Sequence, residues 1–135
     1  MSAETALRAG LLAVLKADTG ITALLGGAQV YDGAPRGQKH PFVYLDRVET
    51  RPLTADLTEG LEHRVELVAL SVAPDRGEAA DLLSAMARAL ATGTPPTLAG
   101  HRLVSLQTMA TATERLPGAR GWRGRATFRA VTEGA

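Results

Sequence analysis

Histidine and cysteine are the side chains that most readily bind metals or act as bases and nucleophiles. The chain has three histidines, His40, His63 and His101, and no cysteine. None of the histidines forms a pair one helical turn apart, the spacing typical of helical zinc sites. Without cysteine there are no thiolate ligands, disulfides or cysteine nucleophiles. We therefore expect no metal ion and no histidine or cysteine catalysis.

Serine and glycine motifs are equally uninformative about catalysis. No serine occupies a Gly-x-Ser-x-Gly turn, and Ser71 falls at the apolar end of a predicted strand, which favours a core hydroxyl with a hydrogen-bond partner. Gly118, Gly121 and Gly124 recur every third residue, as in some phosphate-binding loops. Such loops present backbone N–H groups at the start of a helix, whereas this segment precedes a predicted strand. We interpret it as a turn and strand entry.

The carboxylates show no spacing that would pair them for acid–base catalysis. Asp32, Asp46, Asp56 and Glu59 are scattered over predicted loops and strand ends, which is typical of solvated surface groups. The sequence therefore predicts a protein that is not an enzyme and that needs no cofactor.

Arginines near the C-terminus form the most distinctive pattern. Arg120, Arg123, Arg125 and Arg129 lie within ten residues. Because alternate residues of a strand share a face, Arg123, Arg125 and Arg129 should project from the same side of the sheet. A linear basic patch of this kind can contact phosphates or carboxylates.

Three interpretations of these arginines are open. They could form cross-strand ion pairs with Glu62 and Glu66, contact a partner protein or another subunit, or bind nucleic acid. Trp122 and Phe128 project from the opposite face, which disfavours a site that combines arginine contacts with base stacking. Trp122 itself is typical of a core position, although tryptophan is also enriched at interface hot spots.

Two amphipathic helices are predicted to position these residues. Ser2 is a suitable N-cap for the first helix, which ends before Asp18. Its apolar face comprises Leu7, Leu11, Val14 and Leu15, with Leu12 beside them, and residues 21–25 could add one more turn. Asp75 and Glu78 match a capping box that opens the second helix. The apolar face of this helix comprises Ala79, Leu82, Leu83, Met86 and Leu90.

Four long strands are predicted between and after the helices, at residues 42–50, 62–72, 103–113 and 122–131, with a short extended piece at 30–31. The loops that join the strand pairs are too short for parallel crossovers. The sequence therefore predicts an α+β fold, a mostly antiparallel sheet with two main helices packed on one face. Residues 1–135 form a single domain in this interpretation.

Composition excludes several classes of partner. Hydrophobic residues make up 45% of the chain and charged residues 21%, which is typical of a globular protein with one core. The formal net charge of +1 is too small for attraction of the whole protein to nucleic acid or anionic lipid. No apolar run approaches the roughly 20 residues needed to span a bilayer, and the N-terminus does not resemble a secretion signal. We expect no membrane partner and a cytoplasmic origin.

Four segments carry a resemblance to a known family: YDGAP at 31–35, PFVYL at 41–45, RVELVALS at 64–71 and EAADLL at 78–83. Together with the first helix and the helix between strand pairs, they resemble the tail-terminator, or tail-completion, family of long-tailed phages and gene transfer agents. The resemblance extends along nearly the whole chain.

The resemblance implies a structural virion protein. Subunits of the family form a six-membered ring that docks on the last ring of tail-tube subunits, ends tail polymerisation and provides the docking surface for the head connector. The partners implied are copies of the chain, the tail-tube protein and the head–tail connector protein, with DNA only passing through a central channel. The implied location is the head-proximal end of the tail, after assembly in the host bacterial cytoplasm.

A closed ring needs two different, complementary patches on each subunit. The polar loops at 34–40 and 51–60 are candidates for contacts between stacked rings, and the arginine-rich strand is a candidate for a partner contact. The candidate ring or partner interface residues are Arg36, Lys39, Arg51, Asp56, Glu59, Trp122, Arg123, Arg125 and Arg129.

Two alternative functions remain at this point. A head–tail joining protein of the neck would have the same lack of catalytic groups but different neighbours in the particle. A small nucleic-acid-binding module would use the basic strand between Arg120 and Arg129. Gene order separates the tail-terminator function from the neck function, because a terminator gene should directly precede the gene of the major tail-tube protein.

Overall fold

The computed structural model describes residues 1–53, 60–118 and 120–134. Helix α1 (Ala3–Ala17) begins where expected, since the Ser2 Oγ atom accepts a hydrogen bond from the Thr5 N–H group at 3.1 Å. Leu7, Leu11 and Leu15 are fully buried on one face of the helix. The predicted cap and apolar face of the first helix are confirmed.

Helix α2 (Thr19–Leu25) is a separate helix rather than an added turn of α1. The chain is extended at Asp18, whose carboxylate accepts a hydrogen bond from the Ile21 N–H group at 2.9 Å and so caps a new helix. Gly26 ends α2 in the left-handed conformation, with φ of 73°.

Helix α3 (Gly77–Ala91) forms as predicted, but its capping box does not. Arg76 is the N-cap residue and makes no side-chain capping bond, while Asp75 accepts a bond from the Gly77 N–H group at 2.9 Å in the preceding turn. Glu78 accepts a hydrogen bond at 2.6 Å from the hydroxyl of Ser71, which is fully buried. The predicted box is wrong because Glu78 is turned toward this buried hydroxyl and away from the helix start.

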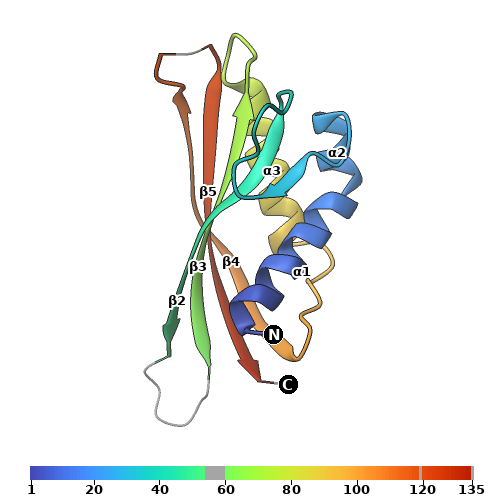
Figure 1. Cartoon of the computed structure of the whole chain (residues 1–135), viewed down its shortest axis with the longest axis vertical. Helices are drawn as coiled ribbons and strands as arrows, with labels where there is room; N and C mark the ends of the chain where they lie inside the picture. Colours follow the sequence, from blue (N-terminus) through green and yellow to red (C-terminus); the bar gives the residue numbers. More distant parts are fainter. Residues whose placement is uncertain (54–59, 119, 135) are drawn as a thin grey trace.

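Five strands form one sheet in the order β1-β2-β3-β5-β4 (Figure 1). Their bounds are Val30–Asp32 for β1, Phe42–Pro52 for β2, Leu61–Ser71 for β3, His101–Arg115 for β4 and Trp122–Gly134 for β5. All neighbours are antiparallel except β1 and β2, which are parallel. A mostly antiparallel α+β fold is therefore confirmed.

The parallel pair lies outside the two long strand pairs to which the loop-length argument applied, because β1 corresponds to the short extended piece predicted at 30–31. A parallel crossover over a long strand needs a long connection, but β1 has only three residues, about 10 Å of strand. The nine residues 33–41 are long enough to return along that length and start β2 beside β1.

The helices cover one face of the sheet and leave the other face to solvent (Figure 1). Helix α1 packs over β1 and β2, and α3 packs over β3, β4 and β5. Leu67 of β3 and Leu83 of α3 lie in the core between the layers, with exposures of 0% and 4%. We call the face that carries the helices the inner face and the opposite one the outer face.

The described part of the β4–β5 connection, residues 116–118 and 120–121, forms a turn that precedes a strand, as predicted from its glycines. Gly121 has φ of 112°, and a β-carbon there would lie 2.0 Å from the backbone oxygen of Ser71. Only glycine allows this close approach of two backbones.

None of the helices that the structure describes is long and apolar enough to cross a membrane.

Candidate functional site

The three arginines of β5 project together from the outer face, as predicted from their alternation with buried residues. The Arg123 Nη2 atom lies 2.7 Å from the Glu114 Oε1 atom of β4. Arg125 lies 3.4 Å from the Asp46 carboxylate of β2. The Arg129 Nε atom donates a hydrogen bond to Glu62 of β3 at 2.7 Å. Each arginine thus has a carboxylate partner on another strand.

The Glu62–Arg129 pair agrees with the cross-strand interpretation, whereas Glu66 lies 4.0 Å from Arg125 and contributes less. The hydrogen bond from Arg129 holds the pKa of Glu62 below its ordinary value. Sequence reasoning did not find Glu114 and Asp46, because their proximity depends on which strands become neighbours and in which register.

Arg51 also lies on the outer face, near the end of β2. Its guanidinium group bonds the Glu49 carboxylate at 2.8 Å, and Arg47 reaches the same carboxylate at 3.2 Å. The outer face is therefore a lattice of alternating charges and not a purely basic surface. Since Arg47, Arg51 and the three arginines of β5 already face carboxylates, this face is poorly suited to bind phosphates.

Long side chains on the outer face also cover apolar surface. Val68 points outward between Tyr44 and Arg125 in the strand register, yet it is fully buried. Burial raises the pKa of Tyr44, with the nearby Asp46 carboxylate acting in the same direction. The aliphatic part of an arginine and the ring of a tyrosine can cover such a site while their polar ends stay in water.

Trp122 lies on the inner face at the start of β5, with 7% of its surface exposed. The guanidinium carbons of Arg76 and Arg115 stand 4.4 and 4.7 Å from the ring centroid. The indole N–H group points to the Pro74 carbonyl oxygen at 3.4 Å. Trp122 therefore joins the start of α3 to the β4–β5 hairpin through cation–π contacts, and its ring is not free to stack on a base.

The remaining candidate residues are not gathered into one site. Arg36 and Lys39 are exposed in the loop before β2, at the opposite end of that strand from Arg51. Asp56 and Glu59 lie outside the described residues. The structure thus brings together Arg123, Arg125 and Arg129, with Arg51 two strands away on the same face, and leaves the loop residues apart.

The histidines show no arrangement suited to catalysis. His63 is fully buried on β3, where its ring nitrogens lie 2.9 Å from the Thr50 hydroxyl and 2.8 Å from the Thr132 hydroxyl. Burial lowers its pKa. His40 packs against Phe42, with ring centroids 4.9 Å apart. Within the described part of the chain, no three histidine or acidic residues are placed to hold a metal ion.

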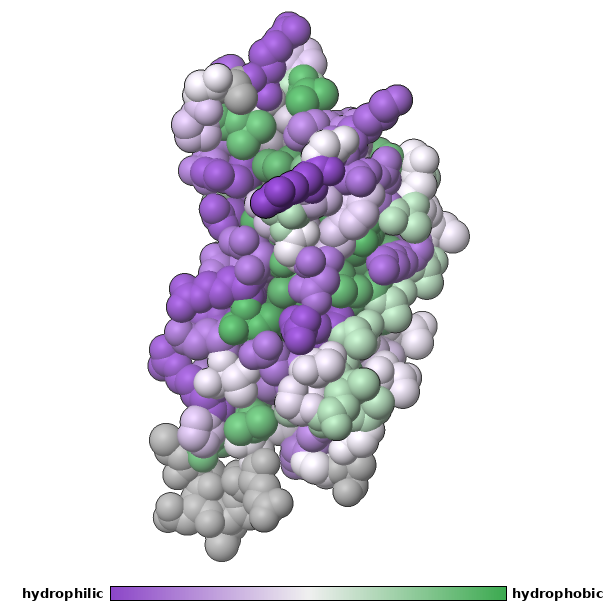
Figure 2. Space-filling view, viewed as in Figure 1, coloured by the Kyte–Doolittle hydropathy of each residue, from purple (hydrophilic) through white to green (hydrophobic). Residues whose placement is uncertain are grey.

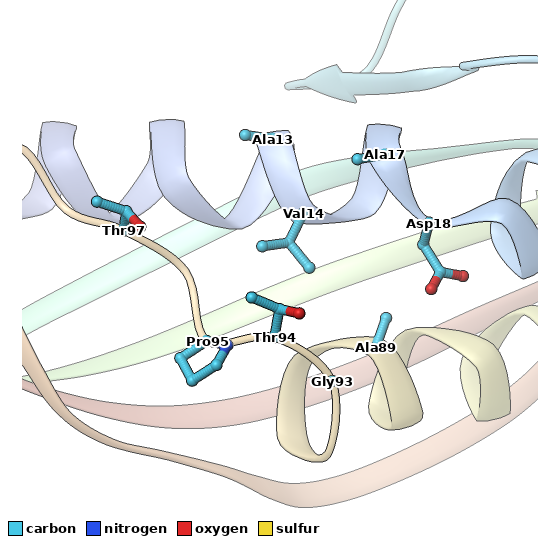
Figure 3. A pocket seen from close by; sticks show the side chains of 9 residues that line it. All are labelled: Ala13, Val14, Ala17, Asp18, Ala89, Gly93, Thr94, Pro95 and Thr97. Carbon is cyan, nitrogen blue, oxygen red and sulfur yellow. The ribbon is translucent and has the colours of Figure 1, made fainter.

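A cavity of about 410 Å³ lies between α1 and the end of α3 (Figure 3). Its lining is mostly small and apolar, and Val14, Thr94, Ala89 and Asp18 line it from the two helices and the following loop. Asp18 is the charged residue in the lining, and it is paired with Arg88 at 2.9 Å, which also lowers the pKa of Asp18. The cavity offers no unpaired charged group for catalysis or specific recognition.

The two sides of the molecule differ in polarity (Figure 2). Pale, weakly hydrophobic residues lie over α1, whereas strongly hydrophilic residues gather over the strands and the loops. The exposed alanines Ala9, Ala13 and Ala17 account for much of the weak hydrophobicity of α1. The described residues thus present extended surfaces and no enclosed polar site.

One surface was missed in the sequence, the free edge of β4. Most of this 15-residue strand is exposed, because within the described residues it has β5 on one side and no neighbouring strand on the other. Val104 and Met109 are half exposed, at 49% and 50%. A readable signal was present, since residues 103–113 contain no charged side chain.

Comparisons with known proteins agree with these features. The family described as "Tail completion protein gp17" matches residues 9–133. A chain of a solved structure, described as "Virion of native gene transfer agent (GTA) particle", is 28% identical, and the alignment covers 98% of each chain at a TM-score of 0.87. No curated protein matches the chain.

The family match leaves out only a few residues at each end, and the structural match spans both layers of the fold. The outer-face charge lattice and the free β4 edge are better suited to contacts between proteins than to catalysis. The chain therefore belongs to the tail completion protein gp17 family, whose members are structural proteins of phage-type tails.

Proposed function

We propose that this protein forms a homohexameric ring that caps the head-proximal end of the tail tube, ends tail polymerisation and offers a docking surface to the head connector. In this proposal DNA only passes through the central channel of the ring. The protein is assembled in the host cytoplasm and remains in the virion. It needs no catalytic group and no cofactor.

The observation that carries the proposal is the family match over residues 9–133, which is a match to tail completion proteins. The similarity to a chain of a gene transfer agent virion supports it, because it extends over 98% of both chains. The physical need is simple. A tube subunit added at the tip exposes the same surface as the one before, so polymerisation has no internal stop at that end.

The two ends of β2 also support the proposal. The candidate loop at 34–40 precedes the first residue of β2, whereas the candidate segment 51–60 begins in the last two residues of β2 and includes residues 54–59, which lie outside the described residues. The 11 residues of β2 place its two ends about 35 Å apart. Segments that leave opposite ends of a rigid strand can serve two opposite faces of a ring, one toward the tube and one toward the connector.

Deletion of the gene tests the proposal. Without the protein, tails should be of uncontrolled length and should not join heads, and a plasmid copy should restore both properties. Electron microscopy of the particles measures tail length and head attachment together. Tails of normal length attached to filled heads would show that the protein caps nothing. Tails of normal length without heads would replace the proposal with a head–tail joining role in the neck.

A further inference from the structure

The free edge of β4 lacks two of the features that usually prevent strand pairing, charged side chains and prolines along its middle. Natural edge strands carry charged side chains or prolines that discourage another strand from adding to the sheet. Residues 103–113 of β4, eleven in a row, contain neither. Charges occur only toward the ends of the strand, at Arg102, Glu114 and Arg115.

Two bulges lie on this edge. The pairing of β4 with β5 shifts register between Leu103 and Ser105 and again between Thr108 and Ala110. The extra residues are Val104 and Met109, and both are about half exposed. The backbone N–H and C=O groups of an uncharged edge strand form a template to which another strand can add.

The opposite edge of the sheet is free along the second half of β2. Strand β1 pairs only with residues 43–45, so residues 47–52 have β3 as their single neighbour in the described structure. Arg47, Glu49 and Arg51 project from the outer face of this segment. Its long charged side chains contrast with the uncharged ones at 103–113 of β4.

The free segments of β2 and β4 lie at the same level, meaning the same position along the strand direction. Glu49 is opposite Arg64, which is opposite Arg129. Arg129 is in turn opposite Gln107 of β4. One row across the sheet thus begins at Glu49 and ends at Gln107. The neighbouring rows join Arg51 to Ser105 and Arg47 to Ala110 in the same way.

The two edges also run in opposite directions. Three successive antiparallel pairings separate β2 from β4, so β4 is antiparallel to β2. Rotation about an axis parallel to the strands keeps both the direction and the level of each strand. A copy related by such a rotation therefore places its β2 edge beside the β4 edge of its neighbour, antiparallel and at the same level.

We propose that adjacent copies of this chain pair through these edges, with residues 103–110 of one copy beside residues 47–52 of the next. The inference rests on the proposed ring and names its subunit interface. Backbone hydrogen bonds continue the sheet across the contact, as in other cases of strand addition. On the outer face, short side chains such as Ser105 and Ala110 leave room for Arg51 and Arg47.

Charge favours this pairing over a two-fold pairing of β2 edges. Antiparallel β2 strands centred on Glu49 would place the two Glu49 carboxylates opposite each other, and like charges directly opposite are unfavourable. The neutral β4 edge places no like charge against Arg47, Glu49 or Arg51. A two-fold pairing of β4 edges would give closed dimers and no ring, and the experiment below separates it from our proposal.

Introduced cysteines test the contact directly, because the chain has none of its own. The double variant Glu49→Cys/Gln107→Cys should form disulfides between copies on mild oxidation of rings or particles. A denaturing gel without reductant should then show a ladder that ends at the closed ring. Arg47→Cys/Ala110→Cys and Arg51→Cys/Ser105→Cys test the neighbouring rows, and each single variant serves as a control that cannot form a ladder.

Charged substitutions at the bulges provide an independent readout. Val104→Lys/Met109→Lys should fold with an unchanged melting curve, since both side chains are half exposed, but should fail to form rings by native mass measurement. Val72→Lys is the matched control, because Val72 is 51% exposed and lies after β3, away from both edges. It should form rings like the wild type.

The possible outcomes distinguish this interface from the proposed function. Rings formed by the Val104→Lys/Met109→Lys variant, or the absence of ladders from all three cysteine pairs, would overturn the interface and leave the ring proposal standing. Disulfide-linked dimers of Thr108→Cys alone would show a two-fold β4 contact and also overturn it. A wild-type protein that forms no ring in solution or on tube ends would overturn the proposed function itself.

Discussion

The side chain of Leu83 on α3 packs against Gly124 of β5 so closely that a β-carbon at position 124 would stand 2.9 Å from the Leu83 Cγ atom. The missing side chain lets α3 approach the sheet at this point. Gly124 therefore has a packing role, and it belongs neither to a phosphate-binding loop nor to the turn before β5.

Substitution of this glycine should destabilise the fold by overpacking. We expect Gly124→Ala to lower the free energy of unfolding by about 1 to 3 kcal/mol, and Leu83→Ala to lower it by about 2 to 5 kcal/mol. In the Leu83→Ala background the alanine at 124 should cost less than in the wild type, because the side chain it meets has been shortened. Urea unfolding of the four proteins measures this coupling. Strictly additive losses would mean that the two residues do not share the contact.

The Arg129–Glu62 pair should contribute pH-dependent stability. The pKa of Glu62 is lowered in the folded protein, so its contribution is present above the ordinary value of about 4.5 and is lost as the pH falls through the lowered pKa. Arg129→Gln should therefore be slightly less stable than the wild type near neutral pH, and the difference should vanish in acid. Thermal melts across this pH range give the comparison.

Arg36→Gln is the matched control for that measurement, because it also removes one positive charge but lies in the exposed loop before β2. It should show no comparable acid-sensitive difference. If Arg129→Gln and Arg36→Gln behave alike at every pH, the effect belongs to net charge and not to the pair.

His63 should make the fold less stable in mild acid. Its pKa is lowered by burial, so below the ordinary value of about 6.5 the unfolded chain takes up a proton before the folded one does. Stability should therefore be full above that value and should fall as the pH drops toward the lowered pKa. We expect His63→Gln to lose less stability between pH about 7.5 and about 5 than the wild type does.

The comparison needs a histidine that is not in the core, and His40→Gln in the exposed loop supplies it. Urea midpoints at both pH values should change in that variant as they do in the wild type. An equal acid loss in His63→Gln and the wild type would place the titrating group elsewhere.

Local periodicity explains why much of the fold could be predicted from the sequence. The cap at Ser2, the buried leucines of α1 and the alternation along β5 depend on residues within a few positions of one another. The capping box at Glu78 failed because its carboxylate bonds Ser71, a residue of the preceding strand. A local motif does not show that the fold will place another hydrogen-bond partner, here the Ser71 hydroxyl, beside the Glu78 carboxylate.

The charge partners show the same limit at longer range. Arginines on one face of β5 could be predicted, and pairing with Glu62 on the neighbouring strand was one of three open interpretations, without an assignment to Arg129. Asp46 could not, because it reaches Arg125 from β2 across an intervening strand. The bulges at Val104 and Met109 could not be predicted either, because no residue type near them in the sequence distinguishes a bulge from a regular exposed strand.

The position of β5 inside the sheet sets an order of events during synthesis. This strand leaves the ribosome after the other four, yet it lies between β3 and β4 and joins them. Until it is made, β4 has no neighbouring strand in the described structure and the sheet is in two parts. The edge that β4 would offer to another copy thus becomes ordered only after β5 has been added. In the proposed ring, a nascent chain would therefore have no ordered β4 edge to offer a neighbour until its own sheet is joined.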